Sequence, residues 1–172
     1  EDRVLVEQDH GQAVQREVTG VRLAFLAFDA VPAPEPAGQV DGWTRAGWDR
    51  EAAVEAVAAA RRHADVVLVM LHWGNEYVPF ASPAQKAMAD ALLAAGATLI
   101  VGQHPHVVQP MEAREDCLVA YSLGNLVFDQ GQEETRLGVV LRVLLDSDGL
   151  RAGQALPVRA GLRPRLLTAE EA

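Results

Sequence analysis

Two histidines separated by a single residue, His104 and His106, follow an apolar run over residues 97–101. An apolar run that ends in glycine and then polar residues is typical of a buried strand leaving the core. In open α/β sheets, ligands bind at the carboxyl ends of the strands. Histidine is the commonest metal ligand in proteins, but it is also frequent in polar turns. The segment 102–110 therefore indicates either a metal site or a turn whose histidines bond to backbone groups.

Pro105 lies between these two histidines. Its ring fixes its own φ and disfavours the helical region for the residue before it. We therefore expect an extended backbone at His104 and a stiff turn.

A third histidine, His72, follows the clearest buried run of the chain, residues 65–71. Ser82-Pro83-Ala84-Gln85 has the pattern of a capping box with proline at the first helical position, and Gly96 is a typical helix end. Strand, helix and strand over this length predict a βαβ unit with parallel strands. Since parallel strands end at one edge, we expect His72 near His104 and His106. This convergence predicts a metal or polar active site, and a hydrogen-bonded polar cluster is the alternative.

The remaining elements follow from similar patterns. Residues 21–28 predict a strand, and Asp29 after it is interpreted as a turn cap, with a functional carboxylate as the alternative. Asp49 is the expected N-cap of a helix that runs to about His63. Further expected features are a short edge strand at 4–6, a solvated turn at His10, a surface excursion over 30–47 with Trp43, strands at 116–121, 126–128 and 137–145, and an antiparallel return over 150–158.

The overall composition is that of an ordinary globular domain. The chain has 172 residues, 49% hydrophobic and 23% charged, with a formal net charge of −9. The absence of a basic run argues against nucleic-acid binding and against an anionic membrane surface. No apolar run reaches the roughly 18 residues of a membrane span. The single cysteine, Cys117, is interpreted as a buried structural thiol, which leaves the redox compartment open.

Several motifs in a fixed order resemble the CapA family of bacterial capsule or poly-γ-glutamate synthesis proteins, whose domain is similar to the calcineurin-like metallophosphatases. The resemblance covers roughly residues 18–146, and several multi-residue motifs in the right order make it specific. Its motifs are Gly20-Val21-Arg22-Leu23-Ala24-Phe25-Leu26, His72-Trp73-Gly74-Asn75-Glu76-Tyr77 with Pro79 and Gln85, Ala95-Gly96-Ala97, Gly102-Gln103-His104-Pro105-His106-Val107-Val108-Gln109, and Tyr121-Ser122-Leu123-Gly124-Asn125-Leu126-Val127-Phe128-Asp129.

The resemblance implies an α/β fold of the metallophosphatase type, an α/β/β/α sandwich with a polar site at the strand ends. It assigns His72, His104 and His106 as ligands of a divalent metal ion, with Mn, Zn or Fe as the expected metals. Three neutral imidazoles with water in the fourth position are a set of ligands that Zn²⁺ accepts.

One departure from the family pattern limits this expectation. The family domain begins with a strand that carries a Gly-Asp motif, followed by an Asn-His pair, and Asp2, Asp9 and His10 lack that context. We therefore expect residues 1–172 to be a single, partial CapA-like domain without its N-terminal part, with 147–172 as a β-hairpin return and surface tail. We expect at most one bound divalent ion and little hydrolytic activity. An exposed strand edge would favour a homo-oligomer or another chain as partner.

Three further residues are candidates for substrate binding or for supporting the histidines. Glu76 is assigned to a substrate amine or to an imidazole, with a solvated loop carboxylate as the alternative. Gln109 is expected either to orient His106 or to cap the turn. Asn125 is either a site residue or only part of a Gly-Asn turn. The aromatic residues Trp73, Tyr77 and Tyr121 are interpreted as packing residues.

Three functions remain open at this point. The resemblance implies a capsule or poly-γ-glutamate biosynthesis protein acting on an anionic polymer, with the cell envelope as the implied location. A metal-dependent phosphoesterase acting on a phosphoester is the second hypothesis. A binding remnant that keeps the fold without the chemistry is the third. The net charge of −9 does not favour a polyanion unless a metal ion or a local arginine cluster supplies the attraction.

Overall fold

The computed structural model describes residues 13–32, 47–168 and 170–171. The residues expected to form an edge strand at 4–6, a turn at His10 and a loop around Trp43 lie outside these ranges. The elements are β1 (Val14–Val18), β2 (Val21–Asp29), α1 (Arg50–Arg61), β3 (Val66–His72), α2 (Pro83–Ala94), β4 (Leu99–Gln103), β5 (Met111–Arg114), β6 (Cys117–Ala120), the 3₁₀ turn η1 (Glu133–Arg136), β7 (Leu137–Asp146), β8 (Gly149–Arg159) and β9 (Arg165–Leu166).

The larger sheet has six strands in the order β1-β2-β3-β4-β6-β5. Strands β2, β3, β4 and β6 run parallel to one another, as the βαβ interpretation predicted for β3 and β4, and β1 and β5 add antiparallel edges. The register pairs Asp29 with His72 and His72 with Gln103. Three central strands therefore end side by side, and polar residues occupy those ends.

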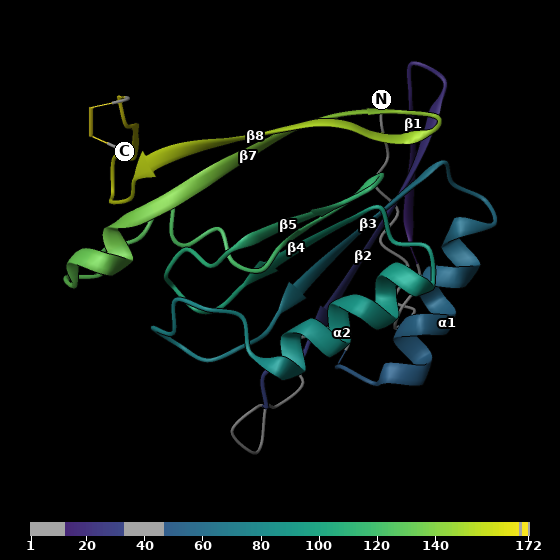
Figure 1. Cartoon of the computed structure of the whole chain (residues 1–172), viewed down its shortest axis with the longest axis horizontal. Coiled ribbons are helices and arrows are strands. Elements are labelled where there is room, and N and C mark those ends of the chain that lie inside the picture. Colours follow the sequence, from purple (N-terminus) through teal and green to yellow (C-terminus); the bar gives the residue numbers. More distant parts are fainter. Residues whose placement is uncertain (1–12, 33–46, 169, 172) are drawn as a thin grey trace, which may run out of the picture.

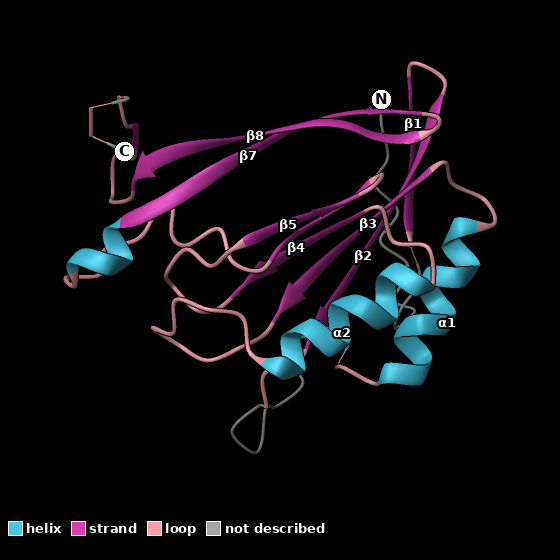
Figure 2. Cartoon of the chain, in the orientation of Figure 1, coloured by secondary structure: helices cyan, strands magenta, loops and turns pink. Residues whose placement is uncertain are grey.

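The molecule is layered. Helices α1 and α2 cover one face of the large sheet, and the long β7–β8 hairpin lies over the other face (Figures 1 and 2). The strands β7, β8 and β9 form the second, antiparallel sheet. The predicted α/β fold is confirmed, although no α-helix lies beyond the second sheet in the described part of the chain.

The main core lies between the helices and the large sheet. Alternate residues of the strands point into it, and Ala53, Val57, Ala89 and Leu92 pack against them from the helices. Because β3 is a central parallel strand, its sequence is a nearly continuous apolar run of Val, Leu and Met up to His72. Among the described residues, no helix has the length and apolar character that crossing a membrane requires.

Both helices begin where their sequences predicted. The Asp49 side chain accepts a hydrogen bond from the backbone N–H of Ala52 at the start of α1. At α2, Ser82 accepts from the Gln85 N–H, and the Gln85 side chain accepts in turn from the Ser82 N–H. These caps satisfy backbone donors that a helix start otherwise leaves unpaired.

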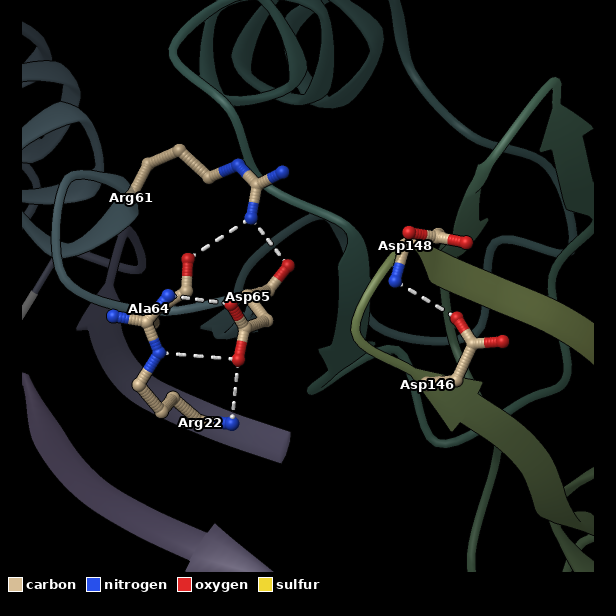
Figure 3. A network of polar contacts seen from close by, with 6 residues as sticks. All are labelled: Arg22, Arg61, Ala64, Asp65, Asp146 and Asp148. Atoms are coloured by element: carbon tan, nitrogen blue, oxygen red, sulfur yellow. Dashed lines mark hydrogen bonds and ion pairs between the residues drawn. The ribbon is translucent and has the colours of Figure 1, made fainter. Parts of the chain in front are cut away.

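The amino ends of β2 and β3 are joined by an ion pair at the edge opposite the histidines (Figure 3). Arg22 donates from its backbone N–H and its guanidinium to Asp65, with Nη2 at 2.6 Å from Oδ1. These bonds lower the pKa of Asp65 to about 2. Arg61 donates to the carbonyls of Ala64 and Asp65, which closes the connection from α1 to β3.

One predicted strand is wrong. Residues 126–128 form a loop, and their side chains Leu126, Val127 and Phe128 are 46%, 63% and 43% exposed. Gly124 precedes this loop with φ +68°, a value that turns the chain out of strand geometry. The apolar residues therefore form the wall of a surface cavity. The strands β1 and β5, which the sequence analysis did not predict, form the two edges of the large sheet.

Candidate functional site

An open cavity of about 700 Å³ lies at the carboxyl ends of the central strands. Four segments contribute to its wall: the ends of β2 and β3, the turn after β4, and the loop at 124–128. The polar and aromatic residues that line it include Asp29, His72, His104, His106, Asn125 and Phe128. This is the edge at which an open parallel sheet binds ligands.

The three predicted histidines lie together in this cavity. The ring centres of His72 and His104 are 4.6 Å apart in an edge-to-face arrangement, and those of His104 and His106 are 6.2 Å apart. His72 comes from β3, whereas His104 and His106 come from the turn after β4. Parallel pairing of β3 and β4 is thus the physical cause of their proximity.

Asn125 determines which nitrogen of His106 carries the proton. The amide nitrogen of Asn125 donates to the Thr135 carbonyl at 3.0 Å and to the Gln130 side-chain oxygen at 3.2 Å. Its oxygen must therefore accept, and it lies 2.9 Å from Nδ1 of His106. Since Nδ1 is the donor, the neutral ring has its lone pair on Nε2. Asn125 is consequently a positioning residue for His106, as one of the two sequence alternatives stated.

Asp29 has the corresponding relation to His72. One oxygen of the Asp29 carboxylate lies 3.0 Å from Nδ1 of His72 and also accepts from the backbone N–H of Val31. The carboxylate acts as an acceptor, so Nδ1 of His72 is the donor, and in the neutral ring the lone pair is on Nε2. Asp29 therefore has both roles that were considered for it, the turn cap and a part of the site. The turn-cap interpretation alone was therefore incomplete.

His104 differs from the other two histidines. Burial, followed by the charge of the neighbouring His72, lowers the pKa of His104 below its ordinary value. Its ring is therefore neutral at neutral pH. A neutral imidazole is the form that accepts a proton or binds a metal ion.

The expected backbone at His104 is wrong. Its φ is +103°, not the extended value that the following Pro105 favours, and His106 is also left-handed with φ +60°. Two hydrogen bonds from the loop after β3 hold this turn: Trp73 N–H to the Gln103 carbonyl at 3.1 Å and Tyr77 N–H to the Pro105 carbonyl at 2.8 Å. Tertiary contacts thus override the local preference. Strained backbone of this kind is often found at functional sites.

Gly102 allows the two histidine segments to approach. The indole Nε1 of Trp73 donates to the Tyr121 carbonyl at 2.8 Å, and this bond passes directly over Gly102. A Cβ at Gly102 would lie 2.0 Å from the Tyr121 oxygen and 2.1 Å from Nε1 of Trp73. Trp73 and Tyr121 are fully buried, which confirms them as packing residues.

Gln109 does not orient His106, which corrects one of the predicted alternatives. Its amide nitrogen donates to the carbonyls of Val78 and Phe80 at 2.8 and 3.0 Å, and its oxygen accepts from Gln85. Gln109 is 2% exposed and holds the loop after β3 in place. Its support of the site is indirect.

Glu76 is exposed on the loop after β3. Its charge counteracts the lowering of the His104 pKa, so it lies within electrostatic reach of that ring. Two aromatic residues that the sequence analysis did not assign to the site flank His106: Tyr77 at 6.1 Å and Phe128 at 5.2 Å between ring centres. Only the fold brings them there, because Phe128 lies in the segment that was predicted to be a strand.

The chemistry of these donors fits a divalent metal ion. Two imidazoles present Nε2 while Nδ1 bonds to a carboxylate or an amide, the usual environment of metal-binding histidines. Within the described residues, however, no group of three or more His, Cys, Asp or Glu side chains is arranged to hold an ion. The residue types and their hydrogen bonds are thus suited to a metal ion, although the described side chains do not form a complete set of ligands.

Comparisons with known proteins identify relatives of this chain. A family model described as bacterial capsule synthesis protein PGA_cap matches residues 6–130. The chain is 36% identical over 143 residues to the PGA biosynthesis protein CapA of Bacillus subtilis and 33% identical over 161 residues to the capsule biosynthesis protein CapA of Bacillus anthracis. These alignments cover 83% and 88% of this chain, and 38% of the length of either relative. A probable polyglutamine synthesis accessory protein of Mycobacterium tuberculosis is 30% identical over 123 residues, 67% of this chain and 32% of its own length.

Proposed function

The chain belongs to the bacterial capsule synthesis protein PGA_cap family, and from this premise we propose that it serves the biosynthesis of an anionic capsule polymer built from γ-linked glutamate. The histidine cavity is the proposed place where the polymer or its precursor binds. The relatives are capsule and PGA biosynthesis proteins by name, and the chain spans little more than a third of their length.

The position of the cavity carries the proposal. His72, His104, His106 and Asn125 all lie in the segment that the family model matches, residues 6–130. Their side chains meet at the strand ends, where α/β sheets bind ligands. The left-handed backbone at His104 and His106 supports a functional role, because each such position is unfavourable by about 1–3 kcal/mol and strain of this kind clusters at functional sites.

The protein groups have defined proton chemistry. Without a bound metal ion, Nε2 of His106 and Nε2 of His72 can accept a proton from a bound amine or water, and Asp29 would stabilise the imidazolium that forms on His72. His104, neutral at neutral pH, supplies a third acceptor. The rings of Tyr77 and Phe128 both lie next to the His106 ring.

We further propose that His72, His104 and His106 hold one divalent ion, with Zn, Mn or Fe as candidates. Such an ion, when bound, would supply Lewis-acid chemistry: it would polarise a carbonyl or phosphoryl oxygen. Asp29 and Asn125 then fix the orientation of two of its ligands.

Binding of a γ-glutamyl oligomer to the 172-residue chain tests the proposal. We expect titration calorimetry to detect binding, and we expect His72→Ala and His106→Ala each to weaken it about tenfold, equivalent to about 1.4 kcal/mol. His63→Ala is the matched control, because His63 is exposed at the end of α1, outside the cavity. Absence of binding, or equal binding by all variants, would overturn the proposal.

A phosphoesterase assay on the same proteins tests the alternative function. Sustained hydrolysis of bis-p-nitrophenyl phosphate by the chain, lost in His106→Ala, would assign the cavity to phosphoester chemistry instead. We expect little hydrolysis.

A further inference from the structure

A second cavity, of about 310 Å³, adjoins the histidine cavity and contains two arginines, Arg136 and Arg159. We propose that it is an anion subsite that binds the free α-carboxylates of the polymer next to the γ-glutamyl unit held at the histidines. This inference rests on the proposed function for the identity of the polymer. The subsite itself rests on the geometry and charge described below.

The two arginines are held side by side by the second sheet. Arg136 ends η1, immediately before β7, and Arg159 ends β8. The register pairs Leu137 with Arg159, and the backbone N–H of Ala160 donates to the Arg136 carbonyl at 2.7 Å. Both guanidinium groups therefore project from backbone that the β7–β8 ladder fixes. They line the same cavity.

The arginine cavity is joined to the histidine cavity by one shared wall residue and by hydrogen bonds. Phe128 lines both cavities and packs against the His106 ring. Asn125, which orients His106, donates to the carbonyl of Thr135, the residue before Arg136. The N–H of Gly161, two residues after Arg159, donates to the Leu126 carbonyl at 3.1 Å. A ligand at the histidines thus has the arginines as fixed neighbours.

The charges in this cavity leave room for an anion. Among the described residues, no carboxylate is paired with Arg136, whose Nε donates to the Gln130 carbonyl at 3.5 Å. Arg159 bonds to Glu133 at 2.6 Å, but the Glu133 side chain is 64% exposed. Exposed ion pairs of this kind contribute little free energy, so a ligand carboxylate can replace Glu133. Asp129 also lines the cavity and is its one acidic wall residue in the described part of the chain.

The arginine pair resolves a conflict between the proposed substrate and the charge of the protein. A chain with a formal net charge of −9 repels a polyanion at long range. Guanidinium groups bind carboxylates with two parallel hydrogen bonds, which gives both attraction and a fixed orientation. A polymer with a carboxylate on every unit offers such groups at regular spacing, so a subsite beside the histidines selects a chain over a single small molecule.

Two measurements on the full 172-residue chain test the subsite. The first is the affinity for a γ-glutamyl oligomer in the wild type, in R136Q/R159Q and in the control Arg142→Gln, whose arginine lies on the exposed surface of β7 and bonds to Gln154. We expect the double variant to bind about tenfold more weakly and the control to be unchanged. The second is the NMR shift of the arginine side-chain N–H signals on adding glutarate or, separately, inorganic phosphate.

The outcomes separate this inference from the proposed function. If glutarate shifts the NMR signals of Arg136 and Arg159, and oligomer binding depends on both arginines, both the subsite and the proposed polymer ligand are supported. If glutarate shifts these signals but the oligomer does not bind, the subsite is supported and the proposed binding of a γ-glutamyl polymer is overturned. Oligomer binding that is equal in wild type and double variant, with unmoved arginine signals, overturns the subsite and leaves the proposed function standing. Shifts with phosphate alone overturn the assignment to carboxylates.

Discussion

Replacing Gly102 by alanine is the substitution whose effect the structure defines most sharply. The new Cβ would lie 2.0 Å from the Tyr121 carbonyl oxygen and 2.1 Å from Nε1 of Trp73. Both distances are far inside van der Waals contact, and one of the atoms is backbone. The Trp73 to Tyr121 hydrogen bond must therefore break or the strand β4 must shift.

The magnitude follows from these two effects. A buried hydrogen bond whose partners are left unsatisfied costs about 1–3 kcal/mol. Forcing a methyl group into a packed core costs about 1–3 kcal/mol more. We expect Gly102→Ala to lower the free energy of unfolding by about 4 kcal/mol, the middle of this combined range. For a domain of this size, that corresponds to a fall in Tm of about 8–16 °C.

Urea unfolding followed by tryptophan fluorescence, together with a thermal scan, measures this loss. Gly153→Ala is the matched control, because a Cβ at Gly153 meets only Leu118 at 3.5 Å, an ordinary contact. We expect the control to change the free energy of unfolding by less than about 1 kcal/mol. If Gly102→Ala were as stable as this control, the close approach of the two histidine segments described above would be refuted.

Three further predictions concern single residues. Because bonds to Arg22 lower the pKa of Asp65 to about 2, this pair stabilises the fold above about pH 4 and loses its effect as the pH falls towards 2. The urea midpoint of Asp65→Asn should therefore be lower than that of the wild type near neutral pH, and the two midpoints should converge in acid. A difference between them that stays constant with pH would contradict this. Asn125→Ala removes the hydrogen-bond acceptor of His106 Nδ1, so we expect calorimetry to show a free energy of unfolding lower by about 1–3 kcal/mol. NMR spectra should show the His106 proton moving from Nδ1 to Nε2; an unchanged tautomer would refute the assignment. His104→Gly should be more stable than His104→Ala by about 1 kcal/mol, since glycine adopts a positive φ without strain, and equal stabilities in denaturant titrations would argue against the strained turn.

Much of the fold was accessible from sequence because local signals and tertiary structure agree. Asp49 and Ser82 cap the helices they were predicted to cap, and the apolar runs before His72 and Gly102 are parallel neighbours. The convergence of the three histidines follows from that pairing alone. Strand order and strand direction were sufficient to predict it.

The failures have a common physical cause. Residues 126–128 have strand-like composition, but their neighbours are the cavity and solvent, which no local pattern reveals. The backbone at His104 is held by hydrogen bonds from Trp73 and Tyr77, which lie about 30 residues earlier in the chain. These bonds override the local effect of Pro105. Asp29 and Gln109 were similarly ambiguous, because each partner comes from a different strand or loop.

The prediction that remains open is the metal ion. The residue types and their hydrogen bonds are suited to a metal ion, but no three of the described His, Cys, Asp or Glu side chains are arranged to bind one together. Expected low hydrolytic activity and an oligomeric state also remain predictions.

Two-bond ¹H–¹⁵N NMR spectra of the histidine rings during a zinc titration test the central claim most directly. We expect His72 and His106 to carry their protons on Nδ1 in the metal-free protein. We also expect the Nε2 signals of His72, His104 and His106 to shift together and to reach their end point at one equivalent of Zn²⁺. Protons on Nε2, or three histidines that respond independently or not at all, would contradict the claim that these residues form one site.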